Sequence, residues 1–338
     1  MQYKLKHLNR DFQVREVFYE PKWCNKNDGY FTILELRKEN INTFDAIQHL
    51  ANKLNVNADC ITYSGLKDED AITTQIVAIN NICDENEVEV ANTSNIEFKI
   101  RGYTQDGLQI GGLHGNAFNI TLRDIKQEDS YLLSNSIGKT LKTISINYYD
   151  NQRFGIPNHI KNTHIIGQYI LENQWENAFN EYLKSGNPQQ EKELMINRSK
   201  IVSYKDAFFD VLDSRKLSFL INSYMSKKWN DELSAIISRA EVNSTMHDNE
   251  VMSLCFLKNG SQINIDNNYL KYDYYSVSKD GSFEKNEKQR QKILFNEVRI
   301  GKFEEDDIFN GKLKLDIFFY MPSGCYATML IKQMFLEL

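Results

Sequence analysis

The sequence has little proline, no long apolar run and no paired cysteines. Only 4 of its 338 residues are proline, and its 5 cysteines are scattered without a CxxC pair. No apolar run approaches the ~18 residues of a membrane-spanning helix, and residues 1–12 lack the apolar stretch of a signal peptide. Because the cysteines are scattered and odd in number, a disulfide framework is not expected. We expect a protein of the cytoplasm with no membrane partner.

Signatures of metal and nucleotide binding are also missing. The 6 histidines lack ligand spacing, and the pair His159 and His164 has no evident third ligand. The run GKT at 138–140 resembles the end of a phosphate loop, but Leu133 stands where that loop needs a glycine. We therefore expect no metal site and no bound cofactor.

Positive charge is in slight deficit. The chain has 40 Lys and Arg against 46 Asp and Glu, a net charge of −6. Because phosphate binding needs positive charge locally, this total argues weakly against a nucleic-acid partner but does not exclude a basic cleft. With 41% hydrophobic and 25% charged residues, the chain has the composition of a protein with a packed core.

Periodic patterns predict an α+β fold with an interruption. Alternation typical of strands occurs at residues 13–20, 30–37, 73–79, 97–102, 116–123 and 312–319. Helical periodicity occurs at residues 43–55, with Thr43 as the expected N-cap, and at 128–143, 166–184, 206–213, 217–229 and 327–336. Between 156 and 300, helical patterns dominate and strand signals are few. The patterns therefore favour one α+β domain interrupted by a helix-rich insertion.

Three polar segments are candidates for function. Segment 63–75, YSGLKDEDAITTQ, places Asp68 in a loop before a strand; a surface turn is the alternative, since Gly and Asp are common in turns. Segment 147–155, NYYDNQRFG, alternates aromatic groups with amide and guanidinium groups, which suit bases and phosphates. Its alternative is a structural loop with a buried Phe154. Segment 285–292, KNEKQRQK, is expected to be a solvated basic helix face, with an RNA-contacting patch as the alternative.

The first two segments resemble signatures of the tRNA pseudouridine synthase D (TruD) family. Segment 63–75 carries all of G-x-KD-x-x-A-x-T-x-Q, and segment 147–155 carries N-Y-[aromatic]-x-x-QRFG. Three further matches follow in family order: DF-x-V-x-E at 11–16, G-N-x-F at 115–118, and P-x-G-S-[FY]-A-T at 322–328, where Cys325 replaces the usual serine.

The resemblance implies a pseudouridine synthase-like fold: a mixed, mainly antiparallel sheet with flanking helices, interrupted by a helix-rich insertion domain. Residues 1–155 and 301–338 would form the catalytic domain, and residues 156–300 the insertion. The implied activity is the isomerisation of uridine to pseudouridine in RNA, with uridine thirteen in the D arm of tRNA as the target. The chain is expected to act as a monomer.

The family's catalytic residues fall on three positions. Its nucleophilic aspartate is Asp68, the basic partner of that aspartate is Lys6, and a nearby asparagine that could hydrogen-bond the nucleophile is Asn147. A carboxylate nucleophile would add to the ribose or, alternatively, to the uracil ring. A nearby cation keeps such a carboxylate ionised; the alternative for Lys6 is an ordinary surface lysine. The reaction involves no redox change, so it needs no cofactor or metal.

The resemblance also implies a set of substrate contacts. Tyr149 occupies the aromatic position that contacts the target base, where bacterial relatives carry Phe. Its ring could stack on the base, and its hydroxyl could act on a proton. The other implied substrate-binding residues are Phe12, Gln75, Gln152, Arg153 and Phe154.

Two other functions stay open at this point. One is the same chemistry on another RNA. The other is a non-catalytic RNA-binding or tRNA-folding protein, which would have no use for Asp68, Lys6 and Asn147 together.

Overall fold

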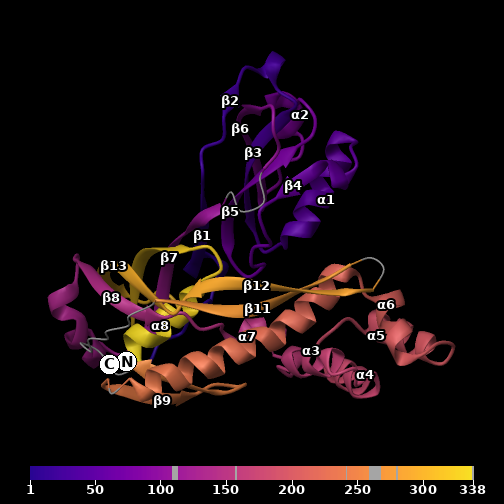
Figure 1. Cartoon of the computed structure of the whole chain (residues 1–338). Helices are drawn as coiled ribbons and strands as arrows, with labels where there is room; N and C mark the ends of the chain where they lie inside the picture. Colours follow the sequence, from indigo (N-terminus) through magenta and orange to yellow (C-terminus); the bar gives the residue numbers. More distant parts are fainter. Residues whose placement is uncertain (109–112, 157, 241, 259–267, 279–280, 337–338) are drawn as a thin grey trace. The chain divides into compact units, whose positions relative to one another are not determined.

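The computed structural model describes residues 1–108, 113–156, 158–240, 242–258, 268–278 and 281–336 (Figure 1). The chain forms two compact units. Unit 1 comprises Met1–Thr143 and Phe295–Ala327, and unit 2 comprises Ile144–Leu294 and Thr328–Glu337. The two units do not coincide with the expected catalytic domain and insertion at residues 156–300, and that functional division stays a prediction.

The strands of unit 1 form one large sheet, whose last strands β8 and β13 cross into unit 2. The strand order is β2-β6-β3-β5-β1-β7-β14-β13-β8, and β4 also pairs with β5. The bounds are β1 (Phe12–Phe18), β2 (Trp23–Cys24), β3 (Phe31–Glu39), β4 (Ile61–Tyr63), β5 (Ile72–Ile79), β6 (Ile96–Thr104), β7 (Leu113–Ile125), β8 (Thr140–Ile146), β13 (Ile293–Glu305) and β14 (Leu313–Pro322). β1 runs parallel to β5 and antiparallel to β7, while β3 is antiparallel to both its neighbours. The expected mixed, mainly antiparallel sheet is confirmed.

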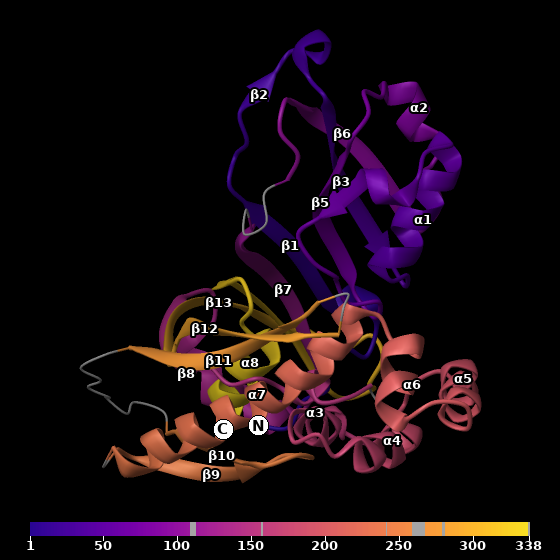
Figure 2. The ribbon, with the colours of Figure 1, turned by 45° about the vertical axis from the view of Figure 1, so that its right-hand side comes forward.

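Helices α1 (Thr43–Leu54) and α2 (Glu85–Glu89) cover one face of β3, β5 and β6 (Figures 1 and 2). The apolar stripe of α1 packs on alternate residues of β3, so Leu50 meets the face that carries Leu34 and Leu36. The N-cap of α1 is Asn42, whose side chain accepts a hydrogen bond of 2.9 Å from the amide of Asp45. The expectation of Thr43 as the cap was wrong by one residue, and the Thr43 hydroxyl has other partners.

Short 3-10 turns complete unit 1 and the chain that follows it. They are η1 (Asn9–Asp11), η2 (Lys26–Asp28), η3 (Ala58–Cys60), η4 (Gln127–Ser136) and η5 (Asn151–Arg153). The expected helix at 128–143 is present as the 3-10 helix η4 up to Ser136 and was wrong beyond it: Gly138, whose φ of 73° breaks a helix, and then β8 follow. The β-branched residues at 140, 143, 144 and 146 favour this strand.

Unit 2 is built around the long helix α7 (Figures 1 and 2). Its helices are α3 (Thr163–Leu171), α4 (Trp175–Lys184), α5 (Gln189–Ser199), α6 (Tyr204–Val211), α7 (Ser214–Arg239) and α8 (Ala327–Phe335), the last beginning at the end of unit 1. The N-terminal half of α7 packs with α3 to α6 in one apolar core. A Cβ at Gly167 of α3 would lie 2.0 Å from the carbonyl oxygen of Leu220, so only glycine permits this approach of the two helices.

Two β-hairpins also belong to unit 2. They are β9 (Ser244–Asp248) with β10 (Ser253–Leu257), and β11 (Tyr269–Val277) with β12 (Phe283–Gln291). The expectation of few strands between 156 and 300 was therefore wrong, as was the basic helix at 285–292, most of which lies in β12. The charges of β12 pair across the hairpin, where Lys285 lies 3.0 Å from Asp273.

Candidate active site

The Asp68 carboxylate lies in a loop of unit 1 and binds the ammonium group of Lys6. The two side chains form a direct ion pair and are 42% and 23% exposed, respectively. The Lys6 nitrogen also lies 4.2 Å from the centre of the Phe12 ring. The ion pair is therefore open to solvent on the side of Asp68, where a reacting group needs access.

The segment that carries Lys6 is fixed by a buried guanidinium group. Arg123 of β7 donates hydrogen bonds of 2.8 Å to Asp11 and to Asp306. The Asp11 carboxylate also accepts a bond of 2.8 Å from the amide of Leu8. Buried charges are stable only when they are paired and hydrogen-bonded. This network therefore anchors the chain two residues after Lys6, whose φ of 55° turns the backbone there.

A buried lysine holds the backbone of the Asp68 loop. Lys38 of β3 is fully buried, and its ammonium group donates to the carbonyl oxygens of Ile41 at 2.7 Å, Asp68 at 2.8 Å and Lys67 at 3.3 Å. Burial lowers the pKa of Lys38 to about 8, while the negative charges of Asp68 and Glu69 oppose that shift.

Two further side chains hold the same loop. The Thr43 hydroxyl accepts from the amide of Lys67 and donates to the side-chain oxygen of Gln75, both at 3.0 Å. The Gln75 amide then donates to the carbonyl of Gly65 at 3.2 Å. Gln75 was expected to bind substrate, and the structure gives its buried side chain these two partners within the protein.

The Lys67 side chain turns inward, away from the Asp68 carboxylate. Its ammonium group lies 2.6 Å from Glu16 of β1, and the other oxygen of Glu16 accepts from the amide of Ile76 at 2.9 Å. The lysine and aspartate that are adjacent in the KD pair thus have different roles. Lys67 ties the loop to the sheet, and Asp68 faces solvent.

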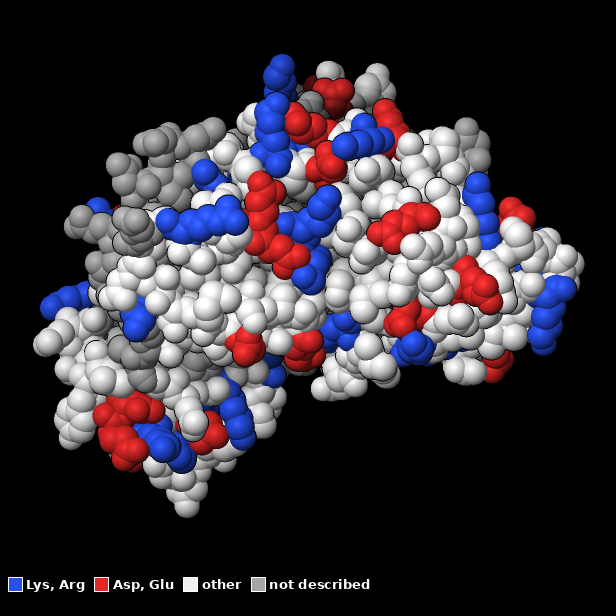
Figure 3. Space-filling model, turned by 60° about the horizontal axis from the view of Figure 1, so that its bottom comes forward, with Lys and Arg blue, Asp and Glu red and all other residues white. Residues whose placement is uncertain are grey.

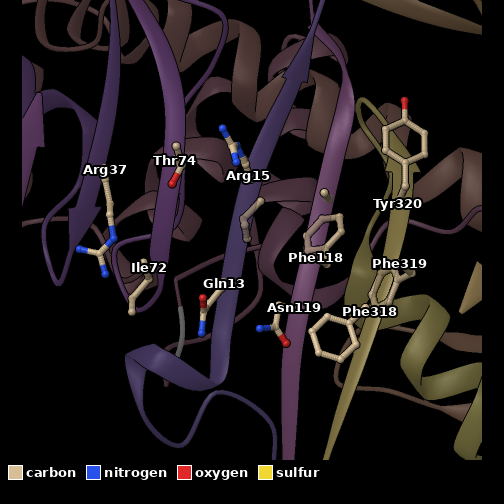
Figure 4. Close-up of a pocket in the computed structure, with 12 residues that line it drawn as sticks. Gln13, Arg15, Arg37, Ile72, Thr74, Phe118, Asn119, Phe318, Phe319 and Tyr320 are labelled. Carbon is tan, nitrogen blue, oxygen red and sulfur yellow. The ribbon is translucent and has the colours of Figure 1, made fainter. Parts of the chain in front are cut away.

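A separate pocket of about 530 Å³ lies across β3, β5, β1, β7 and β14 (Figure 4). Gln13, Arg15 and Phe318 help to line it. Side chains alternate along a strand, so Gln13 and Arg15 face opposite to Phe12 and Glu16. The pocket and the Lys6–Asp68 pair therefore lie on opposite faces of the sheet.

Asn147 is held within unit 2 by the end of β12 and by α7. Its side-chain oxygen accepts from Arg290 at 2.6 Å, and its side-chain nitrogen donates to the carbonyl of Gln291 at 2.9 Å. Its carbonyl oxygen accepts from the indole of Trp229 at 2.9 Å. Asn147 is only 3% exposed. Its amide orientation is thus fixed by partners inside its own unit.

Tyr149 is surrounded by aromatic and cationic side chains. The guanidinium of Arg290 lies 4.2 Å from the centre of its ring. Asn230 of α7 fixes its backbone, accepting from its amide and donating to its carbonyl, both at 2.8 Å. Burial, together with the Tyr149 side chain, raises the pKa of the neighbouring Tyr272. Tyr149 is 9% exposed, and one of its faces is already occupied by Arg290.

The remaining residues of the NYYDNQRFG segment divide between surface and core. Gln152 is exposed, whereas Phe154 is fully buried and meets His164 edge to face at 5.4 Å between ring centres. Arg153 donates to the Ser226 hydroxyl at 3.1 Å, and its guanidinium lies 4.7 Å from the ring of Phe219.

The expected site residues therefore form two sets. Lys6, Phe12, Asp68 and Gln75 lie together in unit 1, whereas Asn147, Tyr149, Gln152, Arg153 and Phe154 lie together in unit 2.

Sequence reasoning missed the residues that support both sets. Lys38 and Tyr272 were not among the expected residues, Thr43 was expected only as a helix cap, and Arg290 was named only within the 285–292 segment, for which an RNA-contacting patch was the alternative. One signal for Lys38 was available: alternation places it on the same face of β3 as Leu34 and Leu36, which predicts burial. Arg290 gave no such signal, because a polar run carries no apolar period.

Charge and metal-ligand clusters add little to the site. On the face drawn in Figure 3, Lys and Arg are interspersed with Asp and Glu. Within the part of the chain that the structure describes, no group of three His, Cys, Asp or Glu side chains could hold a metal ion. The described helices also include none long and apolar enough to cross a membrane.

Comparison with known proteins gives one consistent family. The family model described as tRNA pseudouridine synthase D (TruD) matches residues 1–213. The tRNA pseudouridine synthase D of Aquifex aeolicus is 24% identical over 388 aligned residues, which cover 99% of this chain and 98% of the relative. The protein of the same name from Leptospira interrogans is 26% identical over 404 residues, covering 99% and 96%.

A solved structure shares the fold. The crystal structure of a protein of the same family name from Methanosarcina mazei superposes with a TM-score of 0.62 at 21% identity. The match covers 98% of this chain and 93% of that one. At this level of identity the likeness shows the fold, and the expected pseudouridine synthase-like architecture is confirmed.

Proposed function

Because this chain belongs to the tRNA pseudouridine synthase D family, we propose that it converts uridine thirteen in the D arm of tRNA to pseudouridine, with Asp68 as the nucleophile. Family membership makes the chain an RNA pseudouridine synthase, which is an isomerase. The position of the target uridine and the role of Asp68 are the proposed parts.

The proposed reaction is balanced without an external reagent. A carboxylate oxygen of Asp68 bonds to C1′ of the ribose as the bond from C1′ to N1 breaks, so its electron pair leaves with the uracil. The uracil then turns, and C5 bonds to C1′ while the carboxylate departs. Loss of the proton from C5 and gain of a proton at N1 complete the isomerisation. No atom is gained or lost, and no electron is transferred to a cofactor.

One observation carries this proposal: Asp68 is the exposed member of an ion pair on a loop held by buried side chains. The Lys6 ammonium binds Oδ2 of the Asp68 carboxylate and so helps to orient that group. Lys38, Thr43 and Gln75 fix the loop backbone, so that the carboxylate needs little reorganisation before attack.

The residues of unit 2 are proposed to handle the base. The Tyr149 ring is the proposed stacking surface for the extruded uracil; because it is 9% exposed and lies under Arg290, that side chain must move aside for the base to stack. Asn147 fixes the start of this segment, since Arg290 and Gln291 hold its side-chain amide. The buried Phe154 supports the segment from within. The exposed Gln152 and the half-buried Arg153 remain the candidates for direct contact with RNA.

The test is to incubate the chain with an unmodified tRNA transcript labelled with tritium at C5 of uridine, then to map the product. The proposal predicts tritium release and one pseudouridine, at position thirteen. Release with pseudouridine at another site or only in another RNA would refute the proposed target. RNA binding with no release would favour a binding or folding protein and would contradict the catalytic proposal.

A further inference from the structure

A pocket of unit 2 combines positive charge with aromatic surface at the N-terminal end of α7. We call it the α7 pocket. Its volume is about 330 Å³, and its lining includes Arg153, Arg215, Phe219 and Tyr274. The described residues that line it include no Asp or Glu. This excess of positive charge stands out in a chain whose net charge is −6, and it favours an anionic ligand.

Each aromatic ring of the α7 pocket lies beside a cation. The Arg153 guanidinium is 4.7 Å from the centre of the Phe219 ring, and the Lys288 ammonium is 3.5 Å from that of Tyr274. Phe219 is nevertheless 40% exposed. A large apolar ring held open to water beside an arginine is the kind of surface on which RNA bases stack.

Two neutral polar side chains of the α7 pocket build its walls. The Asn222 side chain donates to the carbonyl of Tyr275 at 2.7 Å and accepts from the Tyr275 amide at 2.9 Å. Ser218 accepts from the amide of Val277 at 3.0 Å. These bonds fasten β11 to α7 and set the separation of Phe219 and Tyr274. The guanidinium groups of Arg153 and Arg215 supply the positive charge of the lining.

We propose that the α7 pocket binds one nucleotide of the RNA substrate, with its phosphate at Arg153 and Arg215 and its base against Phe219. Guanidinium groups match phosphate oxygens in geometry as well as charge. The exposed ring supplies the stacking surface that every base can use. This site extends the proposed function, on which it rests, by locating one nucleotide of the RNA at particular residues of unit 2.

The test measures equilibrium binding of a fluorescent tRNA transcript over a series of salt concentrations. Arg215→Gln removes one phosphate contact, so affinity should fall and the slope of log K against log salt should become shallower by about one. Phe219→Ala removes the ring, so affinity should fall about tenfold at every salt concentration without a change in slope.

Two variants make the result specific. Arg239→Gln removes the same charge at the far, exposed end of α7, and it should bind like the parent. Phe219→Tyr keeps the ring and should recover the affinity that Phe219→Ala loses. If Arg215→Gln and Phe219→Ala bound as the parent does, or if Arg239→Gln weakened binding as much as Arg215→Gln, the α7 pocket would not be a nucleotide site.

The readouts separate this inference from the proposed function. Pseudouridine formation without any effect of Arg215→Gln or Phe219→Ala on binding overturns the α7 pocket alone. Binding that depends on both residues without pseudouridine formation overturns the catalytic proposal and leaves the nucleotide site supported.

Discussion

Lys38 carries a charge that backbone carbonyls hold inside the protein. Three carbonyl oxygens accept from its ammonium group, two of them in the Asp68 loop. Burial is the main cause of its lowered pKa of about 8; the charge of Lys67 adds to the shift, and Asp68 and Glu69 oppose it. Near neutral pH the group is therefore mostly protonated and binds the loop with its full charge.

The rate of a single turnover should fall as the pH rises through about 8, where Lys38 loses its charge. Unfolding does not explain such a fall. The pKa of Lys38 is about 8 in the folded chain and 10.5 in the unfolded chain. Between these two pH values the unfolded chain binds more protons than the folded chain. The contribution of Lys38 to the free energy of unfolding therefore rises with pH in this range. Single-turnover rates against pH, with melting temperatures at each pH, check this. Lys38→Met should be slower throughout and lack this limb; an identical limb in parent and variant would assign the titration to another group.

We predict that Tyr149 serves the reaction through its ring and not through its hydroxyl group. The hydroxyl lies beside that of Tyr272, whose pKa is raised by burial and by Tyr149, and Tyr149 occupies the position at which relatives with Phe have no hydroxyl. Tyr149→Phe should therefore be nearly as active as the parent. Tyr149→Ala should lose the ~1–3 kcal/mol of base stacking. Single-turnover rates on one tRNA decide this, and a Phe variant as slow as Ala would show that the hydroxyl is needed.

At the scale of elements, the first turn of α1 supports the loop that carries Asp68. Thr43 is the first residue of the helix, and its hydroxyl joins the Lys67 amide to the Gln75 side chain. Helix, loop and β5 are thus tied together at one buried oxygen. The threonine of the T-F-D-A helix start has its main role in the site, while Asn42 caps the helix.

Thr43→Val keeps the shape of the side chain and removes its hydroxyl. The part-buried Lys67 amide and the buried Gln75 oxygen would lose their partner, at a cost of about 1–3 kcal/mol for the buried oxygen and less for the amide. The variant should melt at a lower temperature and turn over more slowly even when fully folded. Thr43→Ser keeps the hydroxyl and should retain the rate. Equal losses of rate in Val and Ser variants would contradict a role for that hydroxyl.

Elements were predictable from the sequence where one face is apolar. The strands near 13–20 and 30–37 and the helix at 43–55 alternate or repeat with a clear period, and β1, β3 and α1 lie there. The polar β12 has no such period in its sequence. Its structure depends on its pairing with β11 and on cross-strand ion pairs. Local pattern cannot reveal a strand whose partner decides its structure.

In the candidate site, the residues that match the family signatures were predictable, and the side chains that support them were less so. Asp68 and Lys6 are 62 positions apart, and only the resemblance paired them; the structure confirms their contact. Lys38 and Arg290 act through carbonyl and amide groups whose positions depend on the fold, so their roles emerge only in three dimensions.

At the scale of the whole molecule, the residues proposed for the reaction are divided between the two units. Unit 1 holds the Lys6–Asp68 pair, and unit 2 holds Tyr149 and the α7 pocket. The net charge of −6 does not prevent RNA binding, because positive charge concentrated at one site attracts phosphate locally. The proposed bond to the ribose is made by a single carboxylate, that of Asp68, so one substitution can test it.

The most direct test is tritium release from C5-labelled tRNA by the parent chain, Asp68→Asn and Asp70→Asn. Asp68→Asn removes the nucleophile but keeps the shape of an exposed side chain, so release should vanish while the melting temperature stays nearly unchanged. Asp70→Asn makes the same change at an exposed neighbour two residues away and should release tritium as the parent does. Substantial release by Asp68→Asn would contradict the central claim that this carboxylate forms the bond to the substrate.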